Sequence, residues 1–415
     1  MRTLAFLLGC WSLVTHAQTT RVLFIGNSYT YSNDLPGMFT QLAASMGETV
    51  QTGMVAPGGY TFQGHTTYAA TQTAIAQGDW DFVVFQEQSQ RPAFPPTQVA
   101  VEVYPYATQL AQQVRAANPC TEVVYLMTWG RENGDAANCP NYPPLCTYEG
   151  MQQRLYESYV EMAAQNNAWC APAGEVWRMH RNDFPTTGLY TDGSHPNVLG
   201  SYIAATTLAS TLFRRSCVEA TMVPAGITAE QALAVRTMAS TVVANTALPW
   251  NIGVNDPVAD GDWTLTTGTT VQFANNTVGG ATQLWDLGDG TTSTDADPLH
   301  TYVGPGLYTI SLLVTDECGR SDSTEYTLDL VNTGVANTPD ARGLHVFANA
   351  GYLHLEGGTQ SGTLTLSDAT GRTIGRHELA HEQQQVALPS QYVGPLLWRV
   401  QGTDGRVRSG RIMVQ

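Results

Sequence analysis

The chain is 415 residues long, with 43% hydrophobic residues, only 13% charged residues and a formal net charge of −16. The length predicts more than one domain, and the hydrophobic share is enough for ordinary cores, which excludes wholesale disorder. Because phosphate binding needs clustered Lys and Arg, the acidic balance argues against nucleic acid and anionic lipid as partners. A neutral or weakly polar substrate fits this composition best.

The first seventeen residues have the pattern of an export signal. Arg2 supplies the positive charge, Leu4 to Val14 form a short apolar core, and Ala17 is the small residue that signal peptidase prefers. No later stretch reaches the roughly 18 apolar residues that a membrane-spanning helix needs. We therefore expect a signal peptide at residues 1–17, no transmembrane segment, and an exported mature chain that begins at Gln18.

Six of the seven cysteines lie beyond this signal, and in an oxidising compartment they are disulfide candidates before they are reactive thiols. None has the paired spacing of a zinc site. Cys139 and Cys146 bracket a Pro-rich loop, and a disulfide between them would close it. The other expected pairs are Cys120 with Cys170 and Cys217 with Cys318.

From Arg21 to about Asn245, short β-rich runs alternate with longer helical stretches. The expected strands are residues 21–25, 50–55, 81–85 and 122–127. The expected helices are residues 36–46, 66–77, 97–117, 148–167, 197–213 and 228–244. Such alternation implies parallel strands joined by right-handed crossovers, so we expect an α/β domain with three layers, α/β/α.

After Pro249 the hydrophobic pattern of the sequence changes. Helical periodicity disappears, and short runs of alternating apolar and polar residues are separated by turn residues. The expected strands of a β-sandwich are residues 270–273, 283–286, 307–314 and 325–330. A polar linker at residues 333–342 precedes a second all-β unit at residues 343–415. We therefore expect two all-β sandwich domains behind the α/β domain.

The strongest signal for chemistry is the string from Phe24 to Thr30, directly after the first expected strand. The carboxyl ends of parallel strands line the crevice in which ligands bind, and Gly26 allows a sharp turn that presents Ser28 there. A serine hydroxyl is a poor nucleophile until a base removes its proton. A histidine from elsewhere in the fold must therefore meet Ser28.

The best partner lies near the end of the domain, in the string from Tyr190 to Asn197. Asp192 and His195 are three residues apart on a Gly-containing turn that leads into a helix. This spacing lets the carboxylate reach one imidazole nitrogen while the other nitrogen faces the serine. The sequence therefore predicts a catalytic triad of Ser28, His195 and Asp192.

These strings resemble those of SGNH hydrolases. Gly26-Asn27-Ser28 is similar to their first block, usually Gly-Asp-Ser, and Asp192-Gly-Ser-His195 is similar to their final Asp-x-x-His block. Three longer strings, at residues 25–30, 85–89 and 192–197, resemble a branch of this superfamily that is found in exported Bacteroidota proteins. The match covers roughly residues 20 to 245. The resemblance implies a flavodoxin-like fold and ester hydrolysis through an acyl-enzyme, with no metal and no organic cofactor.

The resemblance also implies an oxyanion hole with three donors. Ser28 supplies its own N–H, and Gly59 is the expected second donor with Gly58 as the alternative. The third donor is usually an asparagine side chain, where this sequence has Gln88. Glutamine is one methylene longer, so its role stays open, and losing such a donor typically costs about 10²- to 10³-fold in rate.

Five further residues are candidates for substrate contact, namely Asn27, Glu87, His65, Trp129 and Arg131. An aromatic ring and an arginine just beyond a strand end suit a sugar or an acid group. Each of these residues also has a structural interpretation. Glu87 would hold the Gln88 loop in place, and His65 would be an ordinary histidine at a helix start.

The string from Trp285 to Gly290, followed by His300-Thr-Tyr302, closely resembles a PKD domain, and the match spans residues 253–332. Its tryptophan is expected to pack in the core, and its Gly-Asp-Gly run to form a tight turn. Such a domain is implied to be a spacer or a weak polysaccharide-binding module, and the spacer interpretation is preferred.

The last unit, with Gly362 to Arg372 and Arg411 to Val414, resembles the C-terminal sorting domain of type IX secretion. This resemblance implies type IX secretion machinery as a partner, export through the periplasm, and a final location at the cell surface or in the medium. The expected division is a signal peptide at 1–17, a hydrolase-like domain at 18–248, a PKD-like sandwich at 253–332, a linker at 333–342 and a sorting domain at 343–415.

Together these features predict an exported serine esterase that removes ester groups, first of all O-acetyl groups on carbohydrate. The choice of O-acetylated carbohydrate as the substrate rests on the association with the two all-β domains, not on the chemistry of the pocket. Short-chain, lipid-like esters are the alternative within the same class. A catalytically silent carbohydrate-binding or adhesin-like surface protein is the alternative outside it, and the Gln88 departure keeps it open.

Overall fold

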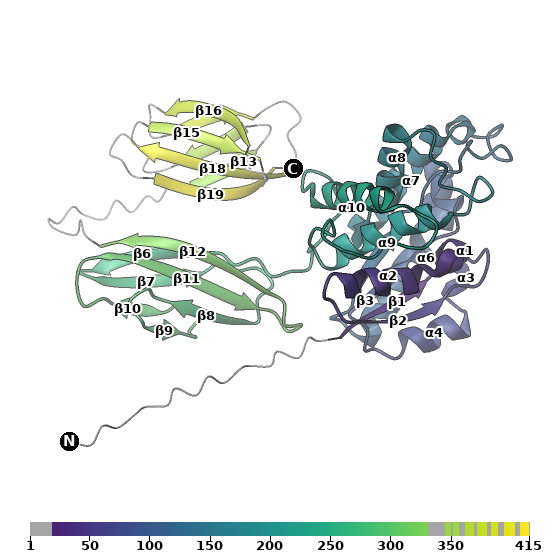
Figure 1. Ribbon diagram of the computed structural model, residues 1–415. Coiled ribbons are helices and arrows are strands. Elements are labelled where there is room, and N and C mark those ends of the chain that lie inside the picture. The colour runs from purple at the N-terminus through teal and green to yellow at the C-terminus, as the bar shows by residue number, and fades with distance from the viewer. Residues whose placement is uncertain are drawn as a thin grey trace, which may run out of the picture. The chain divides into compact units, whose positions relative to one another are not determined.

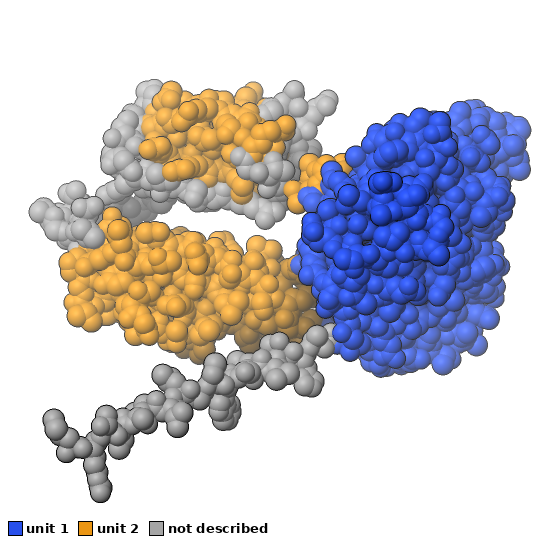
Figure 2. Space-filling view, in the orientation of Figure 1, with its two compact units in different colours: residues 1–244, 250–254 blue, residues 245–249, 255–415 orange. Residues whose placement is uncertain are grey.

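The computed structural model describes residues 19–330 and, further along the chain, residues 345–349, 352–356, 362–368, 372–379, 383–388, 394–402 and 407–414. The chain divides into two compact units (Figures 1 and 2), the first made of Met1–Ala244 with Trp250–Val254 and the second of Asn245–Pro249 with Asn255–Gln415. The expected signal peptide and the expected linker at 333–342 lie outside the described residues. Within the described ranges, no helix is both long and apolar enough to cross a bilayer.

The first unit is built on one parallel sheet of five strands in the order β2-β1-β3-β4-β5. Its strands are β1 (Thr20–Ile25), β2 (Val50–Val55), β3 (Phe82–Phe85), β4 (Glu122–Leu126) and β5 (Trp169–Ala171). The chain reverses direction across the sheet between β1 and β3, and ligands bind at such a switch point, beyond the carboxyl ends of the strands. Ile25 pairs with both Val55 and Phe85, so three strands end level at this edge.

Helices cover both faces of this sheet (Figure 1). The helices are α1 (Ser28–Tyr31), α2 (Leu35–Ser45), α3 (Phe62–His65), α4 (Ala69–Ile75), α5 (Pro96–Glu102), α6 (Tyr104–Ala117), α7 (Tyr148–Gln165), α8 (Ala173–Asp183), α9 (Val198–Leu212) and α10 (Ala229–Ala244). Side chains alternate along a strand, so Val22 and Phe24 of β1 join one core with Phe39 of α2 and Ile203 of α9. The parallel-sheet α/β expectation is confirmed.

One expected helix is divided into two. The stretch 97–117 forms α5 and α6, with Val103 between them at φ −124° and ψ −59°. Pro105 follows two residues later, and its ring removes an N–H donor and clashes with the carbonyl four residues before it. The first helix therefore ends at Glu102. Helix α8 lies in a stretch for which the sequence analysis has no prediction.

The cysteine predictions are partly wrong. Cys139 and Cys146 form the expected disulfide, which closes the loop after β4. Cys170, however, is a free, buried thiol in β5, where it is the register partner of Tyr125 in β4. Cys120 is disulfide-bonded, but the expected pair with Cys170 does not exist.

The second incorrect pair is Cys217 with Cys318. Cys217 is a free, buried thiol whose Sγ contacts the hydroxyls of Ser210, at 3.2 Å, and Ser240, at 3.5 Å. It behaves as a small core residue between α9 and α10 and has no access to a partner thiol. Cys318 is itself disulfide-bonded.

The second unit begins with a sandwich of two antiparallel sheets, in the orders β10-β7-β6 and β12-β11-β8-β9. Its strands are β6 (Gly261–Thr267), β7 (Thr270–Asn275), β8 (Thr282–Asp286), β9 (Thr292–Ser293), β10 (Leu299–Thr301), β11 (Leu307–Thr315) and β12 (Ser321–Asp329). Trp285 lies fully buried in the core against Phe273, at 5.4 Å between ring centroids, as the sequence predicts.

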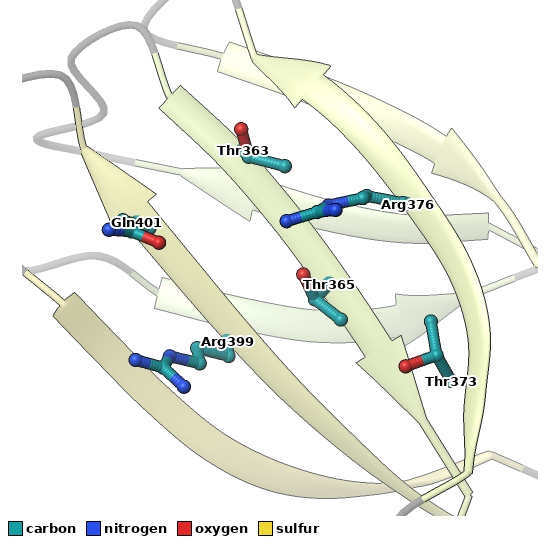
Figure 3. Close-up of a pocket in the computed structure, with 6 residues that line it drawn as sticks. All are labelled: Thr363, Thr365, Thr373, Arg376, Arg399 and Gln401. Atoms are coloured by element: carbon teal, nitrogen blue, oxygen red, sulfur yellow. The ribbon is translucent and has the colours of Figure 1, made fainter.

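Two more antiparallel sheets follow, in the orders β13-β14-β17 and β16-β15-β18-β19. Their strands are β13 (His345–Asn349), β14 (Tyr352–Glu356), β15 (Gly362–Ser367), β16 (Thr373–Leu379), β17 (Gln383–Ala387), β18 (Gly394–Gly402) and β19 (Val407–Val414). On the larger sheet, Thr365 pairs with Arg376 on one side and Arg399 on the other, in a polar hollow of about 310 Å³ (Figure 3). The expectation of all-β structure behind the α/β domain is confirmed.

Candidate active site

Ser28 is the first residue of α1 and follows β1 after a two-residue turn. Asn27 caps this short helix, because its side-chain oxygen accepts the N–H of Tyr29 at 3.2 Å. A Cβ on Gly26 would lie 2.3 Å from the Thr30 hydroxyl oxygen, so only glycine fits at the turn. The chain therefore places the Ser28 hydroxyl beyond the carboxyl end of β1, at the edge predicted for ligands.

The structure brings Ser28, His195 and Asp192 together although 167 residues separate the serine from the histidine. The Nε2 atom of His195 lies 2.9 Å from the Ser28 hydroxyl oxygen, and its Nδ1 atom lies 2.7 Å from a carboxylate oxygen of Asp192. Both distances are those of good hydrogen bonds. The arrangement of hydroxyl, imidazole and carboxylate is that of a nucleophile, a base and a group that orients the base.

Asp192 is held as a carboxylate by its own turn. The N–H of His195, the imidazole of His195 and the N–H of Ser194 donate to it and lower the pKa of Asp192 to about 2. Gly193 adopts a φ of 80°, in the left-handed region that favours glycine, and this lets the turn fold back on the carboxylate. The Asp192 carboxylate therefore stays ionised beside the histidine at pH values well above 2.

A stack of aromatic rings supports the histidine loop. Trp129 donates its indole N–H to the Ser194 carbonyl at 3.2 Å, and its ring lies between those of Tyr29, at 4.9 Å, and Trp177, at 4.0 Å. The Tyr29 hydroxyl contacts the Ser194 hydroxyl at 2.7 Å. Trp129 is only 1% exposed, so it lies beneath the loop that carries His195 and has no surface for a substrate.

The expected oxyanion glycines lie on a tight turn. The N–H of Tyr60 donates to the Pro57 carbonyl at 3.2 Å, and Gly59 within this turn has a φ of 70°. Asn27 donates its side-chain amide to the Tyr60 carbonyl at 2.9 Å and so connects this turn to the loop that carries Ser28. An aspartate at position 27 could not make this bond near neutral pH, since an ionised carboxylate has no hydrogen to donate.

Gln88 is folded back onto its own loop. Its side-chain oxygen accepts the N–H groups of Gln90, at 2.9 Å, and Arg91, at 3.3 Å, and its amide nitrogen donates to the Gln90 side chain at 3.1 Å. These bonds fix the longer side chain, and the amide nitrogen carries a second hydrogen beyond the one that Gln90 receives. Gln88 lines the pocket in front of Ser28.

Glu87 connects the loop that contains Phe62 to the loop that contains Gln88. Its carboxyl group is fully buried and accepts the N–H of Phe62, at 2.9 Å, and the N–H of Gln88, at 2.6 Å. Burial raises the pKa of Glu87 to about 8, although these two N–H donors oppose the rise. Its position matches the structural interpretation, because Glu87 does not line the pocket.

Gln86 is a buried residue that the sequence analysis did not single out. Its side-chain oxygen accepts the N–H of Asn27, at 3.0 Å, and the hydroxyl of Thr30, at 2.9 Å, so it connects the end of β3 to the nucleophile loop. The only available signal was its place directly after a buried strand, beside the Glu-Gln-Ser string. Gln86 orients the backbone on which Ser28 stands.

His65 is buried below the same loop. Its Nε2 atom lies 2.9 Å from the Gly26 carbonyl and its Nδ1 atom 2.7 Å from the Thr71 hydroxyl. Burial lowers the pKa of His65, and a neutral ring that donates from Nε2 satisfies both contacts. Both nitrogens are used, so His65 has no polar atom to offer a substrate.

These loops surround a pocket of about 290 Å³. Its lining residues are Asn27, Ser28, Tyr29, Tyr31, Gly58, Gly59, Gln88, Ser89, Arg131, Ser194 and His195. Among the expected substrate contacts, Asn27 and Arg131 line it, whereas Glu87, His65 and Trp129 do not. The tyrosines and the two further serines were not expected there. Across the described part of the chain, no group of three or more His, Cys, Asp or Glu side chains is placed to hold a metal.

Two protein-family descriptions match parts of this chain. Residues 60–242 match the family described as "Domain of unknown function (DUF4886)", and residues 254–330 match the PKD domain family. The chain therefore carries a DUF4886 domain with structural neighbours of SGNH hydrolase type, followed by a PKD domain.

Two solved structures resemble the first unit. A DUF4886 family protein from Bacteroides uniformis ATCC 8492 is 20% identical, with 55% of this chain and 96% of that chain covered and a TM-score of 0.48. A protein described as "a putative SGNH hydrolase" from Slackia heliotrinireducens is 32% identical, with 47% of this chain and 100% of that chain covered and a TM-score of 0.39.

A curated relative is similar over a shorter stretch. The pre-pro-metalloprotease PrtV of Vibrio cholerae is 37% identical over 91 residues, which are 22% of this chain and 9% of that protein. This chain thus spans only a small part of that relative's length. Disulfides persist in oxidising compartments, so the PKD domain and the disulfide-bonded cysteines together indicate an extracellular protein.

Proposed function

We propose that this chain is an exported serine esterase and that Ser28, His195 and Asp192 are its catalytic triad. The observation that carries the proposal is the continuous hydrogen-bond chain from the Ser28 hydroxyl through His195 to Asp192 at the carboxyl edge of the sheet. A buried or capping serine has no need of a histidine that is itself oriented by a carboxylate. The division into signal peptide, hydrolase-like domain, PKD-like sandwich, linker and type IX sorting domain is part of the same proposal.

In this mechanism the Ser28 oxygen attacks the ester carbonyl while His195 accepts the hydroxyl proton at Nε2. Asp192 stabilises the imidazolium that forms. His195 then donates this proton to the leaving alcohol, which leaves the acyl group on Ser28. A water molecule, deprotonated by His195, attacks the acyl-enzyme and releases the acid, and Ser28 regains its proton.

The oxyanion that forms in both steps needs fixed donors. We assign this role to the N–H of Ser28, the N–H of Gly59 with Gly58 as the alternative, and the side-chain amide of Gln88. The positive φ of Gly59 and the bond from Asn27 to Tyr60 support a fixed turn, which is what such a donor requires. The free hydrogen of the Gln88 amide is available for the third bond.

The pocket favours a small acyl group, so O-acetyl groups on carbohydrate are the proposed substrate. Its volume of about 290 Å³ is at the small end for ligand sites, and its lining is largely polar or aromatic. Short-chain, lipid-like esters remain the alternative within the class. The folded-back Gln88 favours a second candidate, a catalytically silent carbohydrate-binding protein, since a weak oxyanion hole would leave only binding.

The comparison of the parent with Ser28→Ala tests the proposal, with p-nitrophenyl acetate as the ester. The parent is expected to hydrolyse it at least about 10³-fold faster than the variant, because removal of a triad residue leaves only the binding groups and the oxyanion hole. Ser45→Ala is the matched control, since the Ser45 hydroxyl donates within its own helix at 2.8 Å and does not line the pocket. Equal rates in the parent and Ser28→Ala would favour the silent binder.

A further inference from the structure

Arg131 gives the pocket a charge that ester hydrolysis by the triad does not require. It lies in the loop after β4, and it is the one permanently charged side chain among the residues that line the pocket. Neither an aspartate nor a glutamate is among these lining residues. Arg131 therefore presents a positive group at the pocket surface, although Asp135 and Asp192 lie behind the lining residues.

The guanidinium of Arg131 is anchored on one side only. Its Nη1 atom donates to Asp135 at 3.2 Å, and the Asp135 side chain is 1% exposed while that of Arg131 is 27% exposed. The other Asp135 oxygen accepts the side-chain amides of Gln90, at 2.6 Å, and Asn138, at 2.7 Å. Asp135 therefore has donors besides Arg131, and the arginine is not needed to satisfy it.

The remaining donors of Arg131 have no acceptor in the described part of the chain. The Nε atom is buried and makes no hydrogen bond there, and the bond to Asp135 is the one hydrogen bond that this guanidinium donates there. The Nη2 atom is not among the buried atoms and donates no hydrogen bond there, so the outer edge formed by Nη1 and Nη2 can bind a pair of ligand oxygens through two parallel hydrogen bonds.

Arg131 is also next in the chain to a residue that bonds to the turn of His195. The next residue, Glu132, donates its N–H to the Gly193 carbonyl at 2.8 Å, within the turn that carries His195. His195 is the group that gives its proton to the leaving alcohol in the proposed mechanism. The charge of Arg131 is therefore near the alcohol part of the ester. At the same pocket, Tyr31 is 46% exposed and offers a ring face for a sugar.

We propose that Arg131 selects esters whose alcohol part is an acidic sugar, with the sugar carboxylate bound by the guanidinium. This inference rests on the proposed esterase function and adds the charge of its substrate. The carboxylate would accept two N–H bonds from the free edge of Arg131, while the acyl group attached to a neighbouring sugar oxygen faces Ser28. No additional chemical step is needed, because the arginine only positions the sugar.

Two substrates that differ only in this charge test the inference. The first is an O-acetylated methyl glycoside of a uronic acid, and the second is the matching uronamide, with acetate release as the measured quantity. The full-length parent is expected to show a kcat/KM at least about 10-fold higher for the acid, as one charge-assisted bidentate contact predicts. Arg131→Gln is expected to bring the ratio of the two kcat/KM values close to one.

Two further variants keep the test decisive. Arg131→Lys retains the charge but loses the fork, so it is expected to keep only part of the preference, and it answers the question if Arg131→Gln does not fold. Arg215→Gln is the matched control, because Arg215 pairs with Glu48 at 2.8 Å and does not line the pocket, and the parent's ratio is expected there.

The outcomes separate the inference from the proposed function. Equal kcat/KM values for acid and amide in the parent, or an unchanged preference in Arg131→Gln and Arg131→Lys, would overturn the role of Arg131 and leave the esterase intact. A parent that releases no acetate from either sugar and does not hydrolyse p-nitrophenyl acetate would overturn the esterase, and the inference with it.

Discussion

Asn27 stands where the first block of SGNH hydrolases usually has aspartate, and it makes a contact that an aspartate could not make. An aspartate can cap the short helix after β1 as well as asparagine does, through the N–H of Tyr29. Only the amide also donates to the Tyr60 carbonyl, which fixes the turn that holds Gly59. In this chain the residue before the nucleophile therefore orders two loops at once.

Asn27→Asp is expected to lower kcat/KM by about 10- to 100-fold at pH 8, because a buried carboxylate would face the Tyr60 carbonyl and displace an oxyanion donor. A protonated carboxyl can donate to that carbonyl, so the loss relative to the parent is expected to shrink as the pH falls. Ester hydrolysis by both proteins at a series of pH values measures this ratio. A ratio that does not change with pH would contradict the assigned contact.

Glu87 carries a second prediction at this scale, through its raised pKa of about 8. The carboxyl of an unfolded chain titrates near 4.3, so between that pH and about 8 the folded protein holds a proton that the unfolded chain has lost. The stabilisation is therefore fully present below about pH 4.3 and is lost as the pH rises through 8, by about 1.4 kcal/mol for each unit within this window.

Glu87→Gln removes this titration but keeps an oxygen that accepts the N–H of Phe62 or Gln88. The free energy of unfolding of the parent is expected to fall more steeply between pH 5 and pH 8 than that of the variant. Urea denaturation at several pH values measures both slopes. Parallel pH profiles would show that Glu87 is already ionised at pH 5.

At the scale of elements, the stacked rings of Tyr29, Trp129 and Trp177 connect the segment after β4 to the loop that carries His195. Trp129→Phe keeps a ring between Tyr29 and Trp177 but removes the donor to the Ser194 carbonyl. We expect kcat to fall about 10-fold with little change in KM, because a histidine loop that is less fixed is misplaced for proton transfer.

Trp80→Phe is the matched control for the stack, since the Trp80 indole donates to the Ala74 carbonyl and neither residue lines the pocket. Near-ultraviolet circular dichroism checks that both variants keep their tertiary packing. A Trp129→Phe enzyme with unchanged kcat, or with a change in KM alone, would contradict the positioning role.

The alternation of apolar strands and helices predicted the parallel sheet because strands buried on both faces read as continuous apolar runs. The same pattern does not show which helices are interrupted. The break at Val103 arises because the ring of Pro105 clashes with the helical turn that precedes it. Disulfide pairing cannot be read from spacing either, as the free thiols of Cys170 and Cys217 show.

The position of Ser28 was predictable, because a residue directly after β1 lies at the edge where the parallel strands end. Asp192 and His195 lie in the loop between α8 and α9, and their approach to Ser28 was predicted from the base and carboxylate that an activated serine needs. From the sequence, His65 could be a substrate contact or a structural residue, because nothing in the sequence marks a histidine near a helix start as buried. Its two contacts, with Gly26 and Thr71, come from tertiary packing alone. Gln86 was missed for the same reason.

At the scale of the whole molecule, the two compact units have different chemistry. The hollow between Arg376 and Arg399 in the second unit has neither a histidine nor a carboxylate among its lining residues, so it has no group for acid–base work. The pocket at Ser28 combines a nucleophile, a base and a positive side chain. The groups proposed for catalysis therefore lie in the first unit.

Covalent labelling of the full-length protein with a fluorophosphonate, followed by peptide mass spectrometry, shows whether the Ser28 hydroxyl is activated. Such a reagent reacts with a serine whose hydroxyl is activated by a base. We expect one adduct, on the peptide that contains Ser28, with labelling abolished in His195→Ala and retained in Ser45→Ala. An unlabelled Ser28 in folded protein, or equal labelling of Ser28 in His195→Ala, would contradict it.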